Sequence, residues 1–172
     1  MDVSTTGNAF ADGYRMTAEN ETERIRYVQW AADCAERVLA VEDWFWGRLM
    51  ESAIRHARAW TTCPCERHRI VAALTSHNLF EVDAGRFSGF RGTGPSPYAA
   101  VSACANAASA TYVDNYDTVA NKAASDAVQV ARDKSAEKNW QEERRKHYGL
   151  PEPQHPIVEP GAKTLRDPPP RW

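Results

Sequence analysis

Thiol and imidazole side chains gather in one short segment of this sequence. Cys63, Cys65 and His68 belong to the run Cys-Pro-Cys-Glu-Arg-His, with His56 upstream and His77 downstream. Zinc binds thiolates and imidazoles in a tetrahedron. The segment lacks the usual Cys-x-x-Cys spacing, and no second Cys/His pair completes a ligand set. We therefore favour the start of a helix with two small, partly buried thiols, and the sequence predicts no metal and no cofactor.

The same cysteines suggest a second kind of chemistry. A helix N-terminus and a nearby histidine lower the pKa of a thiol, which is what a nucleophilic cysteine needs. No local signature of a cysteine enzyme accompanies Cys63 or Cys65. Free cysteines are common fillers of a core, and this is the role expected of Cys34 and Cys104. A structural role is therefore favoured for all four.

A polar cluster, residues 114–117, interrupts an alanine-rich stretch. If Asp114 and Asp117 faced His56 or His77 across a cleft, the group could carry acid–base catalysis. Asp and Asn side chains also compete for backbone hydrogen bonds, so a kink or a capped break in a helix is the favoured interpretation. These four residues are the catalytic candidates if the chain is an enzyme, which the sequence does not favour.

A glycine-rich segment, residues 84–97, carries Arg86, Phe87, Phe90 and Arg91. It lacks the Gly-Lys-Ser/Thr of a phosphate-binding loop, although a helix N-terminus after it could hold an anion. Arginine and aromatic side chains dominate interface energetics, so a partner-binding loop is one prediction. A plain flexible connector is the commonest role of such a segment.

Two tryptophans mark a second candidate contact surface. Trp44 and Trp46 flank Phe45, and the three rings cannot all face the same way on a helix. An exposed ring of this kind is typical of an interface. It also offers a docking place for the proline-rich segment 151–172, because prolines bind aromatic grooves. The tail or the aromatic turn could in this way join two copies of the chain.

The composition excludes several classes of protein. The chain has 172 residues, of which 26% are charged, and a formal charge of −2, so no basic surface predicts nucleic-acid binding. No stretch approaches the roughly 20 apolar residues that span a bilayer, and no secretory signal is visible. Four scattered cysteines do not make a disulfide framework. We expect a cytoplasmic protein.

Apolar residues recur at steps of three and four along most of the chain, which predicts helices. After a flexible leader, residues 1–20, a first helix is expected over 21–46 with Gly47 at its end. A second amphipathic stretch holds Met50 and Trp60, and a third helix is expected from Pro64 to Val82 with Ile70 and Leu74 buried.

The segment 97–147 predicts one long helix, or two that break near 114–115, with an alanine seam that lets neighbours approach closely. Its last turns, residues 137–146, are expected to form a charged, solvated face with Trp140 as the inward anchor. Gly149 and Pro151 end it. The prediction is an all-α fold: one bundle of about four to five helices over 21–149, followed by an extended proline-rich tail over 150–172.

Two segments resemble a known family. Trp-Ala-Ala-Asp-Cys-Ala-Glu at 30–36 and Ala-Ile-Arg-His-Ala-Arg-Ala-Trp at 53–60 are similar to helices of the Imm-5-like bacterial immunity proteins. The resemblance covers about residues 25–62, with a fainter match over 98–141 that ends at Trp140-Gln141. The aromatic turn, the glycine-rich loop and the tail depart from the family pattern.

The resemblance implies a helical protein that binds and neutralises a partner toxin or effector by covering its surface. We expect the contacts to come from the aromatic turn and the glycine-rich loop. The alternative is a small helical enzyme or ligand-binding accessory protein of a biosynthetic cluster that uses a cleft between His and Asp side chains.

Overall fold

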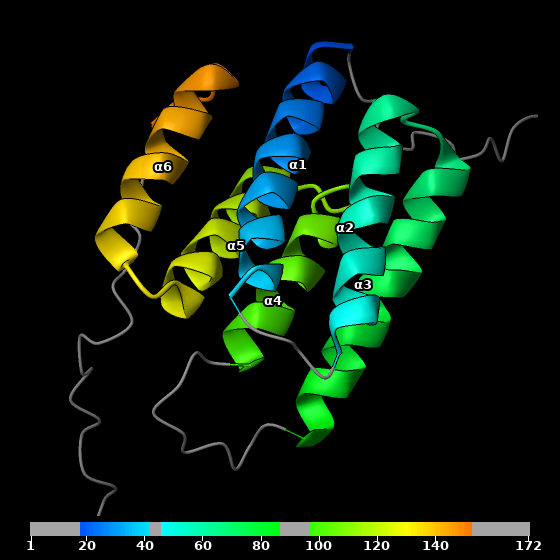
Figure 1. Ribbon diagram of the computed structural model, residues 1–172. Helices are drawn as coiled ribbons and strands as arrows, with labels where there is room; N and C mark the ends of the chain where they lie inside the picture. The colour runs from blue at the N-terminus through cyan, green and yellow to red at the C-terminus, as the bar shows by residue number, and fades with distance from the viewer. Residues whose placement is uncertain (1–17, 42–45, 87–96, 153–172) are drawn as a thin grey trace, which may run out of the picture.

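The computed structural model describes residues 18–41, 46–86 and 97–152, and most of these residues form helices (Figure 1). The helices are α1 (Ala18–Leu39), α2 (Gly47–Thr62), α3 (Glu66–Arg86), α4 (Pro97–Ser109), α5 (Tyr116–Val130) and α6 (Lys134–His147). No strand occurs in the described ranges. The all-α prediction is confirmed. The expected count of four to five is wrong, because the described residues alone contain six helices.

Helix α4 lies at the centre of the fold. It contacts α1, α2, α3 and α5, and every residue from Ala99 to Ser109 is buried. Alanine is the commonest residue of this helix, so its neighbours can approach its backbone closely. Helices α3 and α6 lie at opposite edges of the molecule (Figure 1). The predicted alanine seam is therefore the core of the protein.

The first helix differs from the prediction at both ends, because it begins at Ala18 rather than at residue 21 and stops well before residue 46. Helix α1 ends at Leu39, and Gly47 begins α2, so Gly47 does not end the first helix. The backbone N–H of Val41 donates to the carbonyl of Val38 at 3.2 Å, which turns the chain out of the helix there. The predicted inward residues of α2, from Met50 to Trp60, are buried as expected.

The segment 97–147 forms three helices rather than one or two. The first break spans residues 110–115, close to the expected position, and its turn is closed by hydrogen bonds to the carbonyls of Ala108 and Ser109. The second break was not predicted. There Ala131 is extended and the Asp133 carboxylate accepts the backbone N–H groups of Ser135 and Ala136. A side-chain cap of this kind starts a new helix.

Helix α6 ends as its sequence predicts. Gly149 has a φ of +64°, and it donates its N–H to the carbonyl of Lys146. The N–H of Leu150 donates to the carbonyl of Arg145, and this pair of bonds defines a Schellman motif. Glycine suits this position because a side chain would strain the left-handed conformation.

The predicted aromatic anchors divide into two groups. Trp30 and Trp60 are buried in the core. Trp140 is partly buried, and the guanidinium of Arg37 lies 4.2 Å from its ring centroid. The described helices include none with the length and apolar content to cross a membrane.

Candidate functional site

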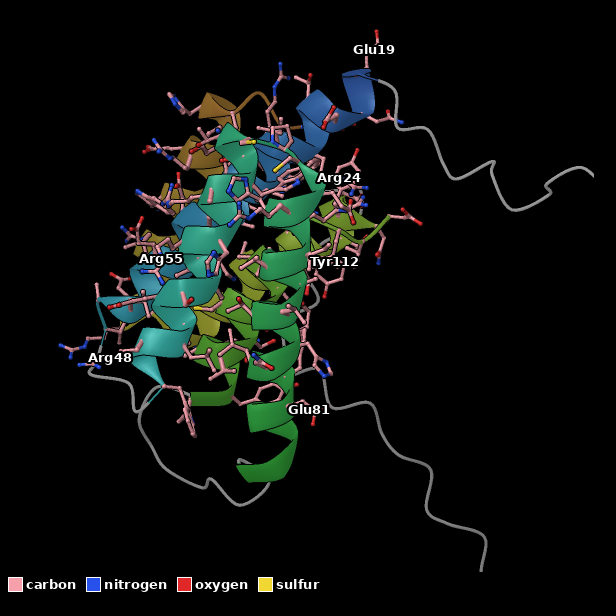
Figure 2. All side chains as sticks on the ribbon, turned by 90° about the vertical axis from the view of Figure 1, so that its right-hand side faces the viewer. Glu19, Arg24, Arg48, Arg55, Glu81 and Tyr112 are labelled. Atoms are coloured by element: carbon pink, nitrogen blue, oxygen red, sulfur yellow. The ribbon has the colours of Figure 1, made fainter. Side chains whose placement is uncertain are left out.

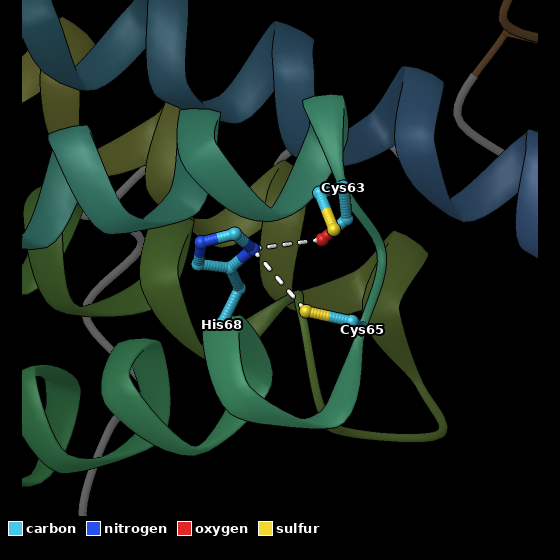
Figure 3. Close-up of side chains that lie close together, drawn as sticks. All are labelled: Cys63, Cys65 and His68. Atoms are coloured by element: carbon cyan, nitrogen blue, oxygen red, sulfur yellow. Dashed lines mark hydrogen bonds between the residues drawn. The ribbon is translucent and has the colours of Figure 1, made fainter.

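The turn between α2 and α3 brings together the thiols and the imidazole of the Cys-Pro-Cys-Glu-Arg-His run (Figure 3). Helix α2 ends where the N–H of Cys63 donates to the carbonyl of Ala59. The N–H of Cys65 then donates back to the carbonyl of Cys63 at 2.7 Å, across Pro64. The fixed φ of proline suits the centre of such a three-residue turn. The chain therefore reverses sharply here, and both cysteines lie at one end of the helix pair.

His68 lies one helical turn after Cys65, on the same face of α3. The carbonyl of Cys65 accepts the N–H of Arg69, so Cys65 is the residue that caps the helix. Nδ1 of His68 lies 3.4 Å from Sγ of Cys65 and 3.0 Å from the carbonyl oxygen of Cys63. The two sulfurs and a ring nitrogen of His68 all lie within 4.8 Å of one another.

The two thiols differ in acidity because of their places in the turn. Hydrogen bonds from the backbone of His68 and from the thiol of Cys63 lower the pKa of Cys65. The hydrogen bond with Cys65 raises the pKa of Cys63. Of the two thiols, Cys65 is therefore the one whose thiolate form is favoured. A thiolate held at a helix N-terminus can act as a nucleophile or a metal ligand.

The four catalytic candidates lie in different places. His56 is partly buried on α2, where burial, then Arg55 and His68, lower its pKa. His77 is exposed on α3 and lies 3.9 Å from the carboxylate of Glu81. Asp114 and Asp117 are exposed at the turn between α4 and α5. The structure does not join these residues into one cleft within the described part of the chain.

Two shallow surface pockets are formed by other residues. One, of about 380 Å³, lies between the end of α1 and the start of α6, and Arg37 and Arg132 line it. The other, of about 460 Å³, lies between the start of α1 and residues 149–151. None of the four catalytic candidates lines either pocket.

The predicted partner-binding residues are described only in part. Trp46 is partly buried and packs against the hydrophobic core, so its ring is not a freely exposed anchor. Trp44, Phe87, Phe90 and Arg91 lie outside the described residues, as does the side chain of Arg86. The proline-rich segment 153–172 also lies outside them, so its docking on the aromatic turn stays a prediction.

Sequence reasoning missed a set of buried polar side chains. The Asp126 carboxylate is 1% exposed and accepts hydrogen bonds from Ser102, Asn106, Lys122 and Gln129. Asp33 is 6% exposed and accepts from Arg58, Arg144 and Tyr148. The spacing of apolar residues identifies the apolar face of a helix and gives no direct sign of buried polar residues. The burial of Asp126 could have been inferred only from its position among the inward alanines of α5.

Helix α6 carries the largest error of this kind. Its buried residues are Glu137, Gln141 and Arg145, which share one face at steps of four. Glu137 accepts from Arg37 at 2.7 Å, and Gln141 donates to the carbonyl of Ala124. The expected solvated face is therefore wrong for Glu137 and Arg145, because their partners lie on α1 and α5 and in residues after α6.

Comparisons with protein-family models, with curated proteins and with solved structures found no match for this chain.

Proposed function

We propose that this chain is a protein-binding helical domain and that the outer face of α3 is its contact surface. The observation that carries the proposal is the exposure of Ile70 and Leu74, which are 49% and 58% exposed. Residues four apart lie one above the other on a helix, so the two side chains form one apolar strip. The expectation that they are buried is wrong.

Most of the side chains on the buried face of α3 are small, whereas the large Ile70 and Leu74 lie on its exposed face. The helix turns Ala72, Thr75, Ser76 and Leu79 inward. Ser76 donates to the carbonyl of Ala105 and bonds the hydroxyl of Ser109, so small polar groups fill much of this interface. The prediction is wrong because α3 turns this face toward the rest of the bundle, and Ile70 and Leu74 lie on the other side of the helix.

The surroundings of the strip suit a protein partner. Phe80 adds a third large apolar side chain that is 38% exposed. Charged groups border the strip, among them Glu66 with Arg69 and His77 with Glu81. Figure 2 views this side of the molecule, with Glu81 labelled on α3. An apolar centre with a polar rim is the usual composition of a protein interface, and a helix face of this kind fits an apolar groove.

The class of partner follows from the Imm-5-like resemblance, which implies a toxin or effector encoded beside this chain. The role is neutralisation by coverage of the partner's surface, without chemistry. Specificity would come from the charged residues at the rim. Enzymatic function is the weaker proposal, because the four catalytic candidates share no cleft in the described residues.

Binding can be tested with a double variant of the full chain. Ile70→Lys with Leu74→Lys places two charges in the strip, and both side chains are already exposed, so the fold should survive. Thr118→Lys with Asn139→Lys is the matched control, because it adds the same charge at exposed positions on α5 and α6. Tagged wild type and both variants are used to capture partners from the source cell.

We expect the wild type and the control to retain one protein that the strip variant loses. With that protein purified, the strip variant should raise Kd by at least about tenfold, as for an interface hot spot. Equal binding by the strip variant would place the contact elsewhere. Failure of a co-encoded toxin to bind the chain, or of the chain to relieve its toxicity, would remove the immunity role.

A further inference from the structure

We propose that Cys63, Cys65 and His68 form a zinc site with three protein ligands and an open fourth position. This inference is independent of the protein-binding role of α3. It differs from the prediction made from sequence, which set the metal aside because the Cys-x-x-Cys spacing is absent. The tight turn at Pro64 brings the two thiols and the imidazole close together, as the usual Cys-x-x-Cys spacing would do for a pair of thiols.

The ligand atoms lie near the separations that zinc requires. Zinc–sulfur and zinc–nitrogen bonds of about 2.3 and about 2.05 Å set tetrahedral ligand atoms about 3.5 to 3.8 Å apart. Sγ of Cys65 and Nδ1 of His68 are 3.4 Å apart, and all three ligand atoms lie within 4.8 Å of one another. Side-chain rotations that move the ligand atoms by about 1 Å bring the larger separations to the values that these zinc bond lengths require.

The turn holds the ligands on rigid elements. Pro64 fixes the backbone between the cysteines, and Cys65 is anchored by the first hydrogen bond of α3. Helices α2 and α3 pack against each other on either side of the turn. A site whose ligands are held close before the metal arrives loses little conformational entropy on binding.

The chemistry of the donors selects the metal. Two thiolates and one imidazole suit zinc, whereas hard cations such as magnesium and calcium take oxygen ligands. Cys63 is exposed, and Cys65 and His68 are partly buried, so an ion can enter from solvent. The fourth position would hold water or a group from outside the chain. Three protein ligands with one open position is the arrangement of catalytic zinc sites.

Binding would exchange protons for the metal. The thiols lose their protons as they become ligands. Nδ1 of His68 lies 3.0 Å from the carbonyl oxygen of Cys63. If that contact is a hydrogen bond from Nδ1–H, the proton moves to Nε2 or to solvent when zinc binds Nδ1. No electron transfer is involved, because zinc does not change its oxidation state.

The test uses the full chain, reduced and freed of metal, with cobalt(II) as a coloured substitute for zinc. We expect thiolate-to-cobalt charge-transfer absorption and the visible bands of a tetrahedral ion, both removed by one equivalent of zinc. Cys63→Ser, Cys65→Ser and His68→Gln should each weaken cobalt binding at least about tenfold. His56→Gln is the matched control, because His56 is a nearby histidine outside the ligand set.

A second measurement does not depend on the variants folding. Zinc should protect Cys63 and Cys65 of the wild-type chain from alkylation, as mapped by peptide mass. The proposal is overturned if the reduced chain gives no charge-transfer band, if the band survives in both cysteine variants, or if zinc leaves alkylation unchanged. Formation of a Cys63–Cys65 disulfide in air with no metal binding in the reduced state would also overturn it.

Discussion

Replacement of Asp126 tests whether the buried polar cluster between α4 and α5 stabilises the fold. Its carboxylate accepts the Ser102 hydroxyl at 2.7 Å and the Asn106 amide at 3.3 Å on one oxygen. The other oxygen accepts the Lys122 ammonium at 2.6 Å and the Gln129 amide at 3.4 Å. Asp126→Ala removes all four acceptor contacts at a position that is 1% exposed.

The magnitude follows from which partners stay buried. Ser102 and Asn106 are 3% and 9% exposed, so water does not readily replace the carboxylate for them. Each buried group left without its partner costs about 1 to 3 kcal/mol. The side chain of Lys122 is 53% exposed and returns to solvent, and Asn106 keeps a bond to Ser102. We therefore expect a loss of about 2 to 4 kcal/mol, below the upper end for a broken buried ion pair.

Urea unfolding at neutral pH, followed by circular dichroism and by the fluorescence of the buried tryptophans, measures this loss. A domain of this size should melt about 4 to 15 °C lower. Asp126→Asn keeps the shape and one acceptor, so it should lose about 1 to 2 kcal/mol. A triple variant with Ser102→Ala, Asn106→Leu and Asp126→Leu removes the carboxylate together with its two buried partners and should recover much of the stability. A loss below about 0.5 kcal/mol for Asp126→Ala would refute the reasoning.

Three further predictions concern α6, Tyr116 and His56. Arg145→Ala should lower the free energy of unfolding by about 2 kcal/mol, because Arg145 is buried and bonds Asn121 and the carbonyl of Pro151. Amide hydrogen exchange should become faster in α6 while exchange in α4 stays slow. Lys146→Ala, at an exposed position, is the control, and equal exchange rates in the two variants would contradict a role of Arg145 in anchoring α6. Burial, aided by Glu23, raises the pKa of Tyr116 to about 12. As the pH rises, the unfolded chain therefore loses this proton before the folded chain does, and stability should fall between about pH 10 and about pH 12. Unfolding curves of Tyr116→Phe should show a weaker loss of stability over this range. An unchanged loss would mean that other groups cause it. Burial lowers the pKa of His56, so the folded state favours the neutral ring and the stability of the protein should fall as the pH drops below about 6.5. In thermal melts from pH 7 to pH 5, His56→Gln should show a smaller loss of stability with acid than the wild type.

Several features of the fold could be predicted because they depend on residues close in the chain. The inward faces of α1 and α2 follow from the spacing of apolar residues, and the structure buries Val38, Met50 and Trp60 on these faces. The end of α6 follows from Gly149, since glycine takes the left-handed conformation of a helix end at low cost. Each of these features depends on residues close in the chain, so it does not depend on which other elements pack against the helix.

Other features could not be predicted because they depend on partners far away in the chain. Ile70 and Leu74 look inward by type, yet α3 packs against α4 through its opposite face, which carries Ser76, and the two side chains face solvent. Glu137 and Arg145 look solvated by type, yet Arg37 and Asn121 reach them from α1 and α5. Burial is a property of the whole packed structure, and periodicity alone does not tell a buried apolar face from an exposed one.

The sequence by itself determined that this protein is helical and that an alanine-rich segment packs against its neighbours, because helix spacing and side-chain size act locally. It also named the thiols and the imidazole of the turn between α2 and α3. Only the tertiary structure decided that these groups converge, because a proline-centred turn and the first turn of α3 set their positions. It likewise decided which polar groups are buried, since that depends on long-range hydrogen bonds that no local pattern encodes.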